Sequence, residues 1–207
     1  MYNIKENLHK VLADLPAGVR LVAVSKFHPV EELMAAYEEG QRIFGESHEQ
    51  ELKLKHQALP DDIEWHFIGH LQTNKVKYIA PYISMIDAVD SMKLLREINK
   101  QAQKNNRVIK VLLELHIAEE ETKYGLTLDA CRELLEAGEW RELKNVQICG
   151  LMMMASYVDD QEQIRQEMMM AADFYNEVKT RFFADDAHFC ERSWGNESRL
   201  SHCCSVP

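Results

Sequence analysis

The sequence predicts an α/β fold: a (β/α)8 TIM barrel that is incomplete at its seventh and eighth strands. Nearly continuous apolar segments of strand length alternate with segments of helical periodicity along most of the 207 residues. Short connections, and strands that are apolar on both faces, are typical of a parallel sheet covered by helices. At least six such units follow one another and no Gly-x-Gly-x-x-Gly sequence follows a strand, which favours a barrel over a doubly wound sheet.

Local signals predict where the individual elements begin and end. A first helix over 3–14 has apolar residues along one face. The next helix has Pro29 at its start and Gly40 after its end, the usual positions of these residues around a helix. Ser91 and Thr127 are predicted N-caps of later helices. In chain order, strands are expected over 20–26, 42–47, 64–70, 85–90, 110–117 and 146–155, and the further helices over 29–37, 48–59, 72–79, 92–105, 127–138 and 160–182.

Composition and charge restrict the class of protein. The chain is 46% hydrophobic and 28% charged, which suits one soluble domain. Its net charge of −10 should repel nucleic acid, so the short basic clusters Lys53-Leu54-Lys55 and Lys75-Val76-Lys77 are predicted to be solvated helix faces. No apolar stretch approaches the roughly 20 residues that span a bilayer, and the first residues are polar. We therefore expect a cytoplasmic protein without membrane or nucleic-acid partners.

The cysteines give no sign of a disulfide framework or a metal site. There are five of them, unevenly spaced and without a Cys-x-x-Cys pair. Their spacing relative to the histidines fits no standard zinc pattern, so no metal is expected. Cys131 and Cys149 lie within apolar segments and are predicted to be small core residues.

Polar residues gather at the ends of the predicted strands, and one of them is a lysine. In a barrel the carboxyl ends of all strands meet on one face, where active sites lie. Lysine amines can form Schiff bases with carbonyl compounds, although a lysine at a strand end is commonly only solvated. The convergence of other polar groups makes Lys26 the candidate functional residue. The segments concerned are Ser25-Lys26, Gly45-Glu46-Ser47, Gly69-His70, Asp87 to Ser91, His116 to Ala118 and Gly150 to Met152.

Several longer motifs carry a resemblance to a known family. They occur in one order over about residues 1–195, and the segment around His70 is the longest and most specific of them. On these motifs the chain resembles the pyridoxal phosphate homeostasis proteins, single-domain relatives of the alanine racemase N-terminal barrel. The motifs are Leu21-Val22-Ala23-Val24-Ser25-Lys26, Phe44-Gly45-Glu46, Trp65-His66-Phe67-Ile68-Gly69-His70-Leu71-Gln72-Thr73-Asn74-Lys75, Ile117 to Gly125, and Gly150-Leu151-Met152.

The resemblance implies a cofactor and a role. Lys26 would hold pyridoxal 5'-phosphate as a Schiff base, and Lys123 would be a second lysine able to take or release the aldehyde. The family is regarded as carriers in vitamin B6 homeostasis that lack efficient catalysis, with apo-enzymes as possible recipients and a monomeric state. An amino-acid racemase-like enzyme, or a truncated product with impaired binding, are the alternatives. The other residues that would contact the cofactor are Ser47, His70, Asn74, Met152, Ser193 and Gly195.

The chain departs from the family pattern at two places. Many members have asparagine where Ser47 stands, and serine has a shorter reach. Members also continue after Ser-Met-Gly into a helix and an eighth strand whose backbone grips the cofactor phosphate. Here Ser193-Trp194-Gly195 is followed by a polar tail, so we expect 1–195 to be the single barrel domain and 196–207 to be aberrant. Strands one and six would then have exposed edges.

We predict that this tail arises from a frameshift. Reading the codons from Asn196 onward one base later permits Met-Ser-His-Asp-Tyr-Pro-Ile-Ala-Val, which is how family members continue. Sequencing the coding DNA should show a family-like ending in frame after a one-base correction. A downstream sequence that encodes no such ending in the shifted frame would contradict the prediction.

Overall fold

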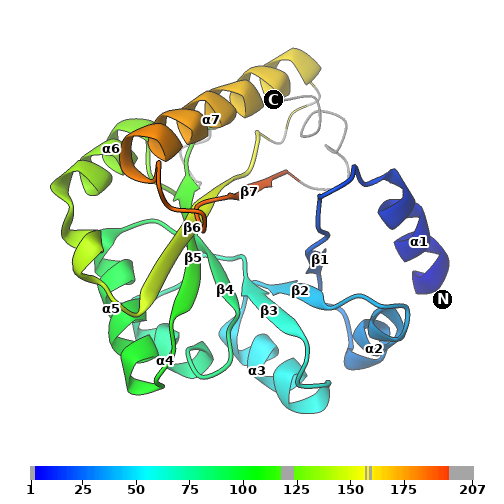
Figure 1. The fold of residues 1–207 in the computed structure, drawn as a ribbon. Coiled ribbons are helices and arrows are strands. Elements are labelled where there is room, and N and C mark those ends of the chain that lie inside the picture. The colour runs from blue at the N-terminus through cyan, green and yellow to red at the C-terminus, as the bar shows by residue number, and fades with distance from the viewer. Residues whose placement is uncertain (1–2, 118–123, 157, 159, 196–207) are drawn as a thin grey trace.

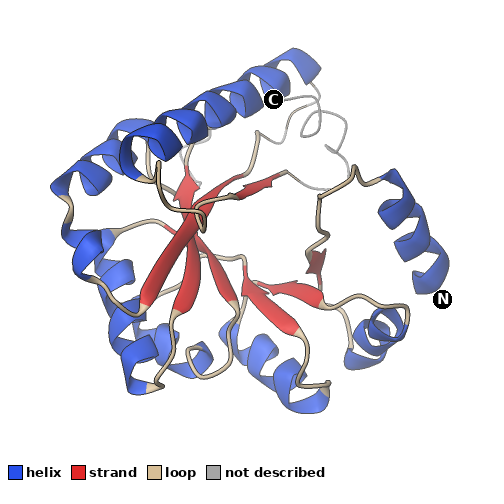
Figure 2. Ribbon diagram, in the orientation of Figure 1, coloured by secondary structure: helices blue, strands red, loops and turns tan. Residues whose placement is uncertain are grey.

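The computed structural model describes residues 3–117, 124–156, 158 and 160–195. Its seven strands form one sheet in the chain order β1 to β7, and every neighbouring pair is parallel. The sheet curls into an open barrel with the helices on its outer side (Figures 1 and 2). Among the described residues, β1 and β7 pair only with β2 and β6, so they form the two edges of the sheet. The predicted class, an incomplete α/β barrel, is confirmed.

The elements lie close to their predicted positions. The N-caps Ser91 and Thr127 are confirmed, because each side-chain oxygen accepts a backbone N–H three residues later. The strands are β1 Ala23–Val24, β2 Ile43–Glu46, β3 Glu64–Phe67, β4 Met85–Val89, β5 Ile109–Leu115, β6 Val146–Met153 and β7 Glu191–Trp194. The α-helices are α1 Ile4–Asp14, α2 Val30–Glu38, α3 Glu49–Ala58, α4 Val76–Ile79, α5 Met92–Lys104, α6 Leu128–Ala137 and α7 Gln161–Phe182, and short 3₁₀ helices span Thr73–Lys75 and Glu139–Glu142.

Two expected elements differ from the structure. The first strand was expected over 20–26, but only Ala23–Val24 forms a ladder, because β2 is its single partner. The predicted helix over 72–79 is divided into the 3₁₀ helix Thr73–Lys75 and α4.

The seventh strand corrects the prediction about the edges of the sheet. Glu191–Trp194 pairs with β6 along its whole length, with Met152 opposite Ser193. The exposed edges are therefore those of β1 and β7, and β6 is an interior strand. The apolar residue Phe189, which is fully buried just before β7, anchors this strand against α7.

The core has two layers, one on each side of the sheet. The large outer layer lies between strands and helices and includes Phe44 and Trp65, whose rings are 5.9 Å apart. The smaller layer fills the barrel interior with Met85, Ala88, Leu112, Cys149 and Met152. Cys131 and Cys149 are both buried, as the sequence predicted.

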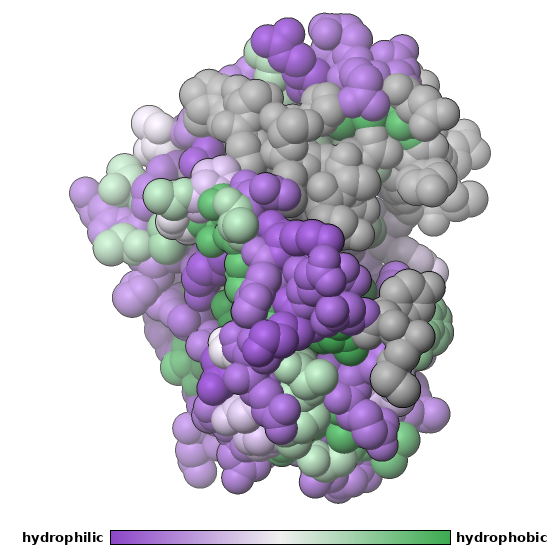
Figure 3. All heavy atoms as spheres, turned by 90° about the vertical axis from the view of Figure 1, so that its right-hand side faces the viewer, coloured by the Kyte–Doolittle hydropathy of each residue, from purple (hydrophilic) through white to green (hydrophobic). Residues whose placement is uncertain are grey.

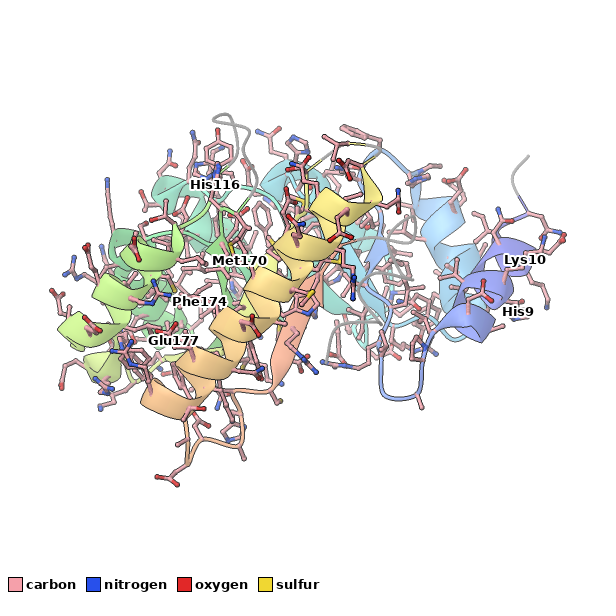
Figure 4. All side chains as sticks on the ribbon, turned by 90° about the horizontal axis from the view of Figure 1, so that it is seen from above. His9, Lys10, His116, Met170, Phe174 and Glu177 are labelled. Atoms are coloured by element: carbon pink, nitrogen blue, oxygen red, sulfur yellow. The ribbon has the colours of Figure 1, made fainter. Side chains whose placement is uncertain are left out.

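Helices α6 and α7 pack along one side of the barrel. Arg132 of α6 donates from Nε and Nη2 to the two carboxylate oxygens of Glu177 on α7, at 2.8 and 3.0 Å. Its guanidinium also lies over the ring of the buried Phe174, 5.0 Å from the centroid. In Figure 4 Met170, Phe174 and Glu177 follow one another along α7, beside α6. This pair of helices covers β5 and β6.

The surface is mainly hydrophilic on the side that α1 covers (Figure 3). Lys5 and His9 of α1 both reach Glu39, which follows α2, at 2.7 and 3.1 Å. Within the described residues, no helix is long and apolar enough to cross a membrane.

Gly150 is predicted to be essential for the attachment of β7. A β-carbon there would overlap the backbone carbonyl of Glu191, so no larger residue fits between β6 and β7. Gly150→Ala should lower the free energy of unfolding by about 1–3 kcal/mol, measured by urea unfolding.

A matched control is Gly18→Ala, since Gly18 has a φ of +86° and open space around its α-carbon. It should cost only about 1 kcal/mol, from the left-handed backbone. Equal effects of the two substitutions would contradict the close approach of β6 and β7.

Candidate functional site

The predicted site residues lie at the carboxyl ends of their strands. Lys26 follows β1 by two residues, Ser47 directly follows β2, and His70 follows β3. Met152 and Ser193 are opposite one another on β6 and β7. His116, just after β5, marks this end of the barrel at the top of Figure 4. Parallel pairing therefore brings most of the predicted residues to one face.

Lys26 stands in a tight turn over residues 25–28. The Ser25 carbonyl accepts the N–H of His28 at 3.1 Å and so closes the turn. Phe27 has a φ of +67°, a left-handed conformation that costs a non-glycine residue roughly 1–3 kcal/mol. Side chains alternate along β1, and Val22 and Val24 line a cavity. The same alternation places Lys26 on the cavity side of the strand, where it is exposed but is not itself one of the lining residues.

This first cavity lies between β1 and β7 and opens into the barrel. Its volume is about 360 Å³, and β7 contributes Ser193 and, just beyond its end, Gly195 to the wall. At the opposite ends of the strands, Arg20 donates to Glu191 at 2.5 Å and links the two edges. The lining also includes His66, Met85, Asp87 and Leu112 from the interior strands, and residues between Val11 and Arg20 that precede β1.

A second cavity, also of about 360 Å³, lies beside β3 and β4. Its wall contains His70 and Asn74 together with Asp90. The ring of His70 stacks on Tyr124, with centroids 3.8 Å apart, and its Nδ1 lies 3.3 Å from Asp90 Oδ2. The two cavities share no lining residue, so the predicted contacts divide into a group with Ser193 and Gly195 and a group with His70 and Asn74.

The remaining predicted residues have different surroundings. Ser47 is half-buried against Gly69, whose α-carbon position leaves no room for a side chain. Met152 is buried in the interior apolar layer. Lys123 lies outside the described residues, so its position stays a prediction.

Ionisable groups in the barrel interior were only partly predicted from the sequence. Buried His66 lies 3.1 Å from Asp87 Oδ1 and 3.3 Å from Oδ2, and only the second contact has hydrogen-bond geometry. Glu114 of β5 is also buried, and its Oε2 has no hydrogen-bond partner among the described residues. Burial raises the pKa of Glu114 to about 7, and the negative charge of Asp90 contributes to the increase. Sequence reasoning missed Glu114 because it lies within an apolar run.

Lys55 is the clearest error of the sequence prediction. It was expected on a solvated face of α3, but its side chain is only 4% exposed. Its Nζ donates to Ser25 O, Glu46 Oε1 and Glu51 Oε1, each at 2.6 Å. The helical spacing of Lys55 from buried Leu52 and Leu59 places it on the apolar face of α3, a signal that could have revealed its burial.

A parallel α/β barrel with an exposed lysine at the end of its first strand defines the class of this protein. The alanine racemase N-terminal domain family matches residues 1–190, and the chain belongs to this family. The chain is 38% identical to the pyridoxal phosphate homeostasis protein of Aquifex aeolicus over 164 residues, which cover 79% of this chain and 71% of that protein. It is 40% identical to the protein of the same name in Schizosaccharomyces pombe over 146 residues, 70% of this chain but 61% of that protein.

Solved structures agree with this assignment. The structure of PipY from Synechococcus elongatus without pyridoxal phosphate superimposes with a TM-score of 0.83 at 28% identity, covering 94% of this chain and 99% of that chain. PipY with pyridoxal phosphate bound gives a TM-score of 0.79 at the same identity, covering 93% and 96%. The predicted family and fold are confirmed.

Glu114 should make stability depend on pH. Its pKa is about 7 in the folded chain and near the ordinary 4.5 when unfolded, so the folded state binds the proton more tightly between these values. The free energy of unfolding should therefore fall as pH rises from 4.5 to 7, by about 1.4 kcal/mol for each unit of pKa difference. Glu114→Gln should remove this slope and stabilise the protein relative to wild type above pH 7.

Urea unfolding across this pH range measures the effect. Glu133→Gln, at an exposed position of α6, is the control for the loss of one negative charge. The same slope in wild type and Glu114→Gln would contradict the prediction.

Proposed function

We propose that the chain binds pyridoxal 5'-phosphate through a Schiff base on Lys26 and takes part in vitamin B6 homeostasis. The observation that carries the proposal is the exposed Lys26 just after β1, the strand that lines one side of a cavity whose other side holds Ser193 and Gly195. When bound, the cofactor supplies an aldehyde, which condenses with a lysine amine and releases water. Relatives named pyridoxal phosphate homeostasis proteins and the cofactor-bound PipY support the choice of ligand.

The described residues fit the aldehyde end of this cofactor better than its phosphate. An exposed lysine just beyond a strand that lines a small cavity suits covalent attachment, and both cavities have volumes typical of small-molecule sites. For the phosphate, the hydroxyl of Ser193 is available on β7. The backbone N–H of Gly195 is directed toward Met153 O at 3.5 Å, a weak contact that leaves it accessible.

The remaining predicted residues would hold the ring. His70 and Asn74 offer polar groups from the second cavity, and Ser47 and Met152 lie at the ends of their strands. Each hydrogen bond to a charged group contributes about 1.5–3 kcal/mol. Each donor missing from the phosphate should therefore weaken binding by roughly tenfold or more.

The proposed role is that of a carrier without efficient catalysis. Racemisation needs a proton-transfer group on each side of the substrate carbon. The relatives are named as homeostasis proteins, which supports this interpretation. We further propose that the protein is cytoplasmic and monomeric, that residues 1–195 form its binding domain, and that apo-enzymes receive the cofactor from it.

Absorbance of the purified protein tests the function directly. Wild type mixed with pyridoxal phosphate should develop the absorbance band of a protonated Schiff base, and Lys26→Ala should lose at least nine-tenths of it. Borohydride reduction followed by peptide mass spectrometry should locate the label on Lys26 and would reveal any label on Lys123.

Lys53→Ala is the control, because it removes an exposed lysine of α3 outside the site. A full band in Lys26→Ala would refute the assignment of the lysine. Rapid racemisation of alanine would favour the enzyme alternative, and colourless protein at high cofactor concentration would favour a truncated, non-binding product.

A further inference from the structure

The turn that carries Lys26 is held by a buried ionic cluster, which consists of Ser25, Glu46, Glu51 and Lys55. Glu46 is fully buried at the end of β2, on the side of the sheet that α3 covers. Ser25 Oγ donates to Glu46 Oε1 at 2.7 Å and also contacts the carbonyl of Gly45 at 3.2 Å. Lys55 of α3 donates from Nζ to the same oxygen of Glu46. The cluster therefore joins β1, β2 and α3.

The ammonium of Lys55 has three acceptors at hydrogen-bond distance, which matches its three N–H donors. Two of the acceptors are carboxylates, Glu46 and Glu51, and the third is the backbone carbonyl of Ser25. A buried charge is tolerated only with such partners, so the positions of all four groups depend on one another. Burial opposes ionisation of Glu51, but hydrogen bonds from Lys55 and the Phe27 N–H outweigh it and lower the pKa of Glu51.

The cluster holds the backbone on both sides of Lys26. Before it, the Ser25 carbonyl accepts from Lys55 as well as from the N–H that closes the turn. After it, the N–H of Phe27 donates to Glu51 Oε1 at 2.7 Å. Phe27 is 78% exposed, so packing of its side chain does not explain its left-handed backbone. The hydrogen bond to Glu51 explains this left-handed backbone, since it requires the Phe27 N–H to face α3.

We propose that Lys55 is a positioning residue for Lys26: through Ser25 and Glu51 it keeps the turn in the conformation that places Lys26 on the cavity side of β1. This inference rests on the proposed function but concerns residues outside the proposed cofactor contacts. Without Lys55, the positive φ of Phe27 would lose its support, and the turn would populate conformations in which Lys26 is no longer held on the cavity side of β1.

The test combines two measurements on the full chain. The first is the affinity for pyridoxal phosphate, from titration of the Schiff-base absorbance. The second is hydrogen exchange at the Phe27 amide, which reports the turn without any cofactor. Lys55→Met should weaken binding at least tenfold and accelerate this exchange at least tenfold. Glu51→Ala, at a partly exposed position where folding should persist, should have the same two effects.

Two controls separate positioning from general destabilisation. Lys53→Met removes a lysine two residues away on the exposed face of α3. Arg132→Met breaks the pair with Glu177 between α6 and α7, away from β1 (Figure 1). Both should leave binding and Phe27 exchange unchanged. Adding Phe27→Gly to Lys55→Met should restore part of the affinity, because glycine adopts a positive φ without strain.

The outcomes distinguish this inference from the proposed function. Unchanged affinity and unchanged Phe27 exchange in folded Lys55→Met or Glu51→Ala would overturn the positioning role. If wild type forms no Schiff base, the proposed function fails, and hydrogen exchange at the Phe27 amide alone tests whether Lys55 holds the turn. Faster exchange in Lys55→Met than in wild type would then support the role of Lys55 in the turn, and unchanged exchange would refute it.

Discussion

The structure depends on one constraint, the unbroken parallel hydrogen bonding of seven strands in chain order. Because every strand runs the same way, every strand ends on the same face, and the side chains that follow the strands must meet there. Val24, two residues before Lys26, and Ser193 are far apart in the chain and yet line one cavity, since β1 and β7 are the edges of the curled sheet. Gly150 permits the last of these pairings, because β7 approaches too closely for any side chain at that position.

Charge is placed on both sides of the sheet near this face. On the outer side, the ammonium of Lys55 lies between the carboxylates of Glu46 and Glu51, beside the large apolar layer. On the inner side, Glu114 forms no ion pair with any described residue, and burial raises its pKa toward neutrality. Burial disfavours ionisation of both Glu51 and Glu114, but hydrogen bonds lower the pKa of Glu51, whereas the pKa of Glu114 is raised.

Much of the fold could be predicted from the sequence, because local signals mark its elements. Ser91 and Thr127 are N-caps in both the prediction and the structure. The first strand was expected to be longer, since apolar sequence alone does not reveal that β1 pairs only with β2 among the described residues. Lys55 was assigned to the solvent because basic residues usually remain there, although its spacing from Leu52 and Leu59 placed it on the buried face.

The sequence by itself determined the alternation of strands and helices, the position of Lys26 at the end of an apolar strand, and the motifs of the family. These features are local, and they can be recognised from neighbouring residues. Only the tertiary structure decided that β7 pairs with β6, that His70 stacks on Tyr124, and that Lys55 binds the turn of Lys26. Such contacts join residues far apart in the chain, and they exist only once the curled sheet has brought its strand ends together.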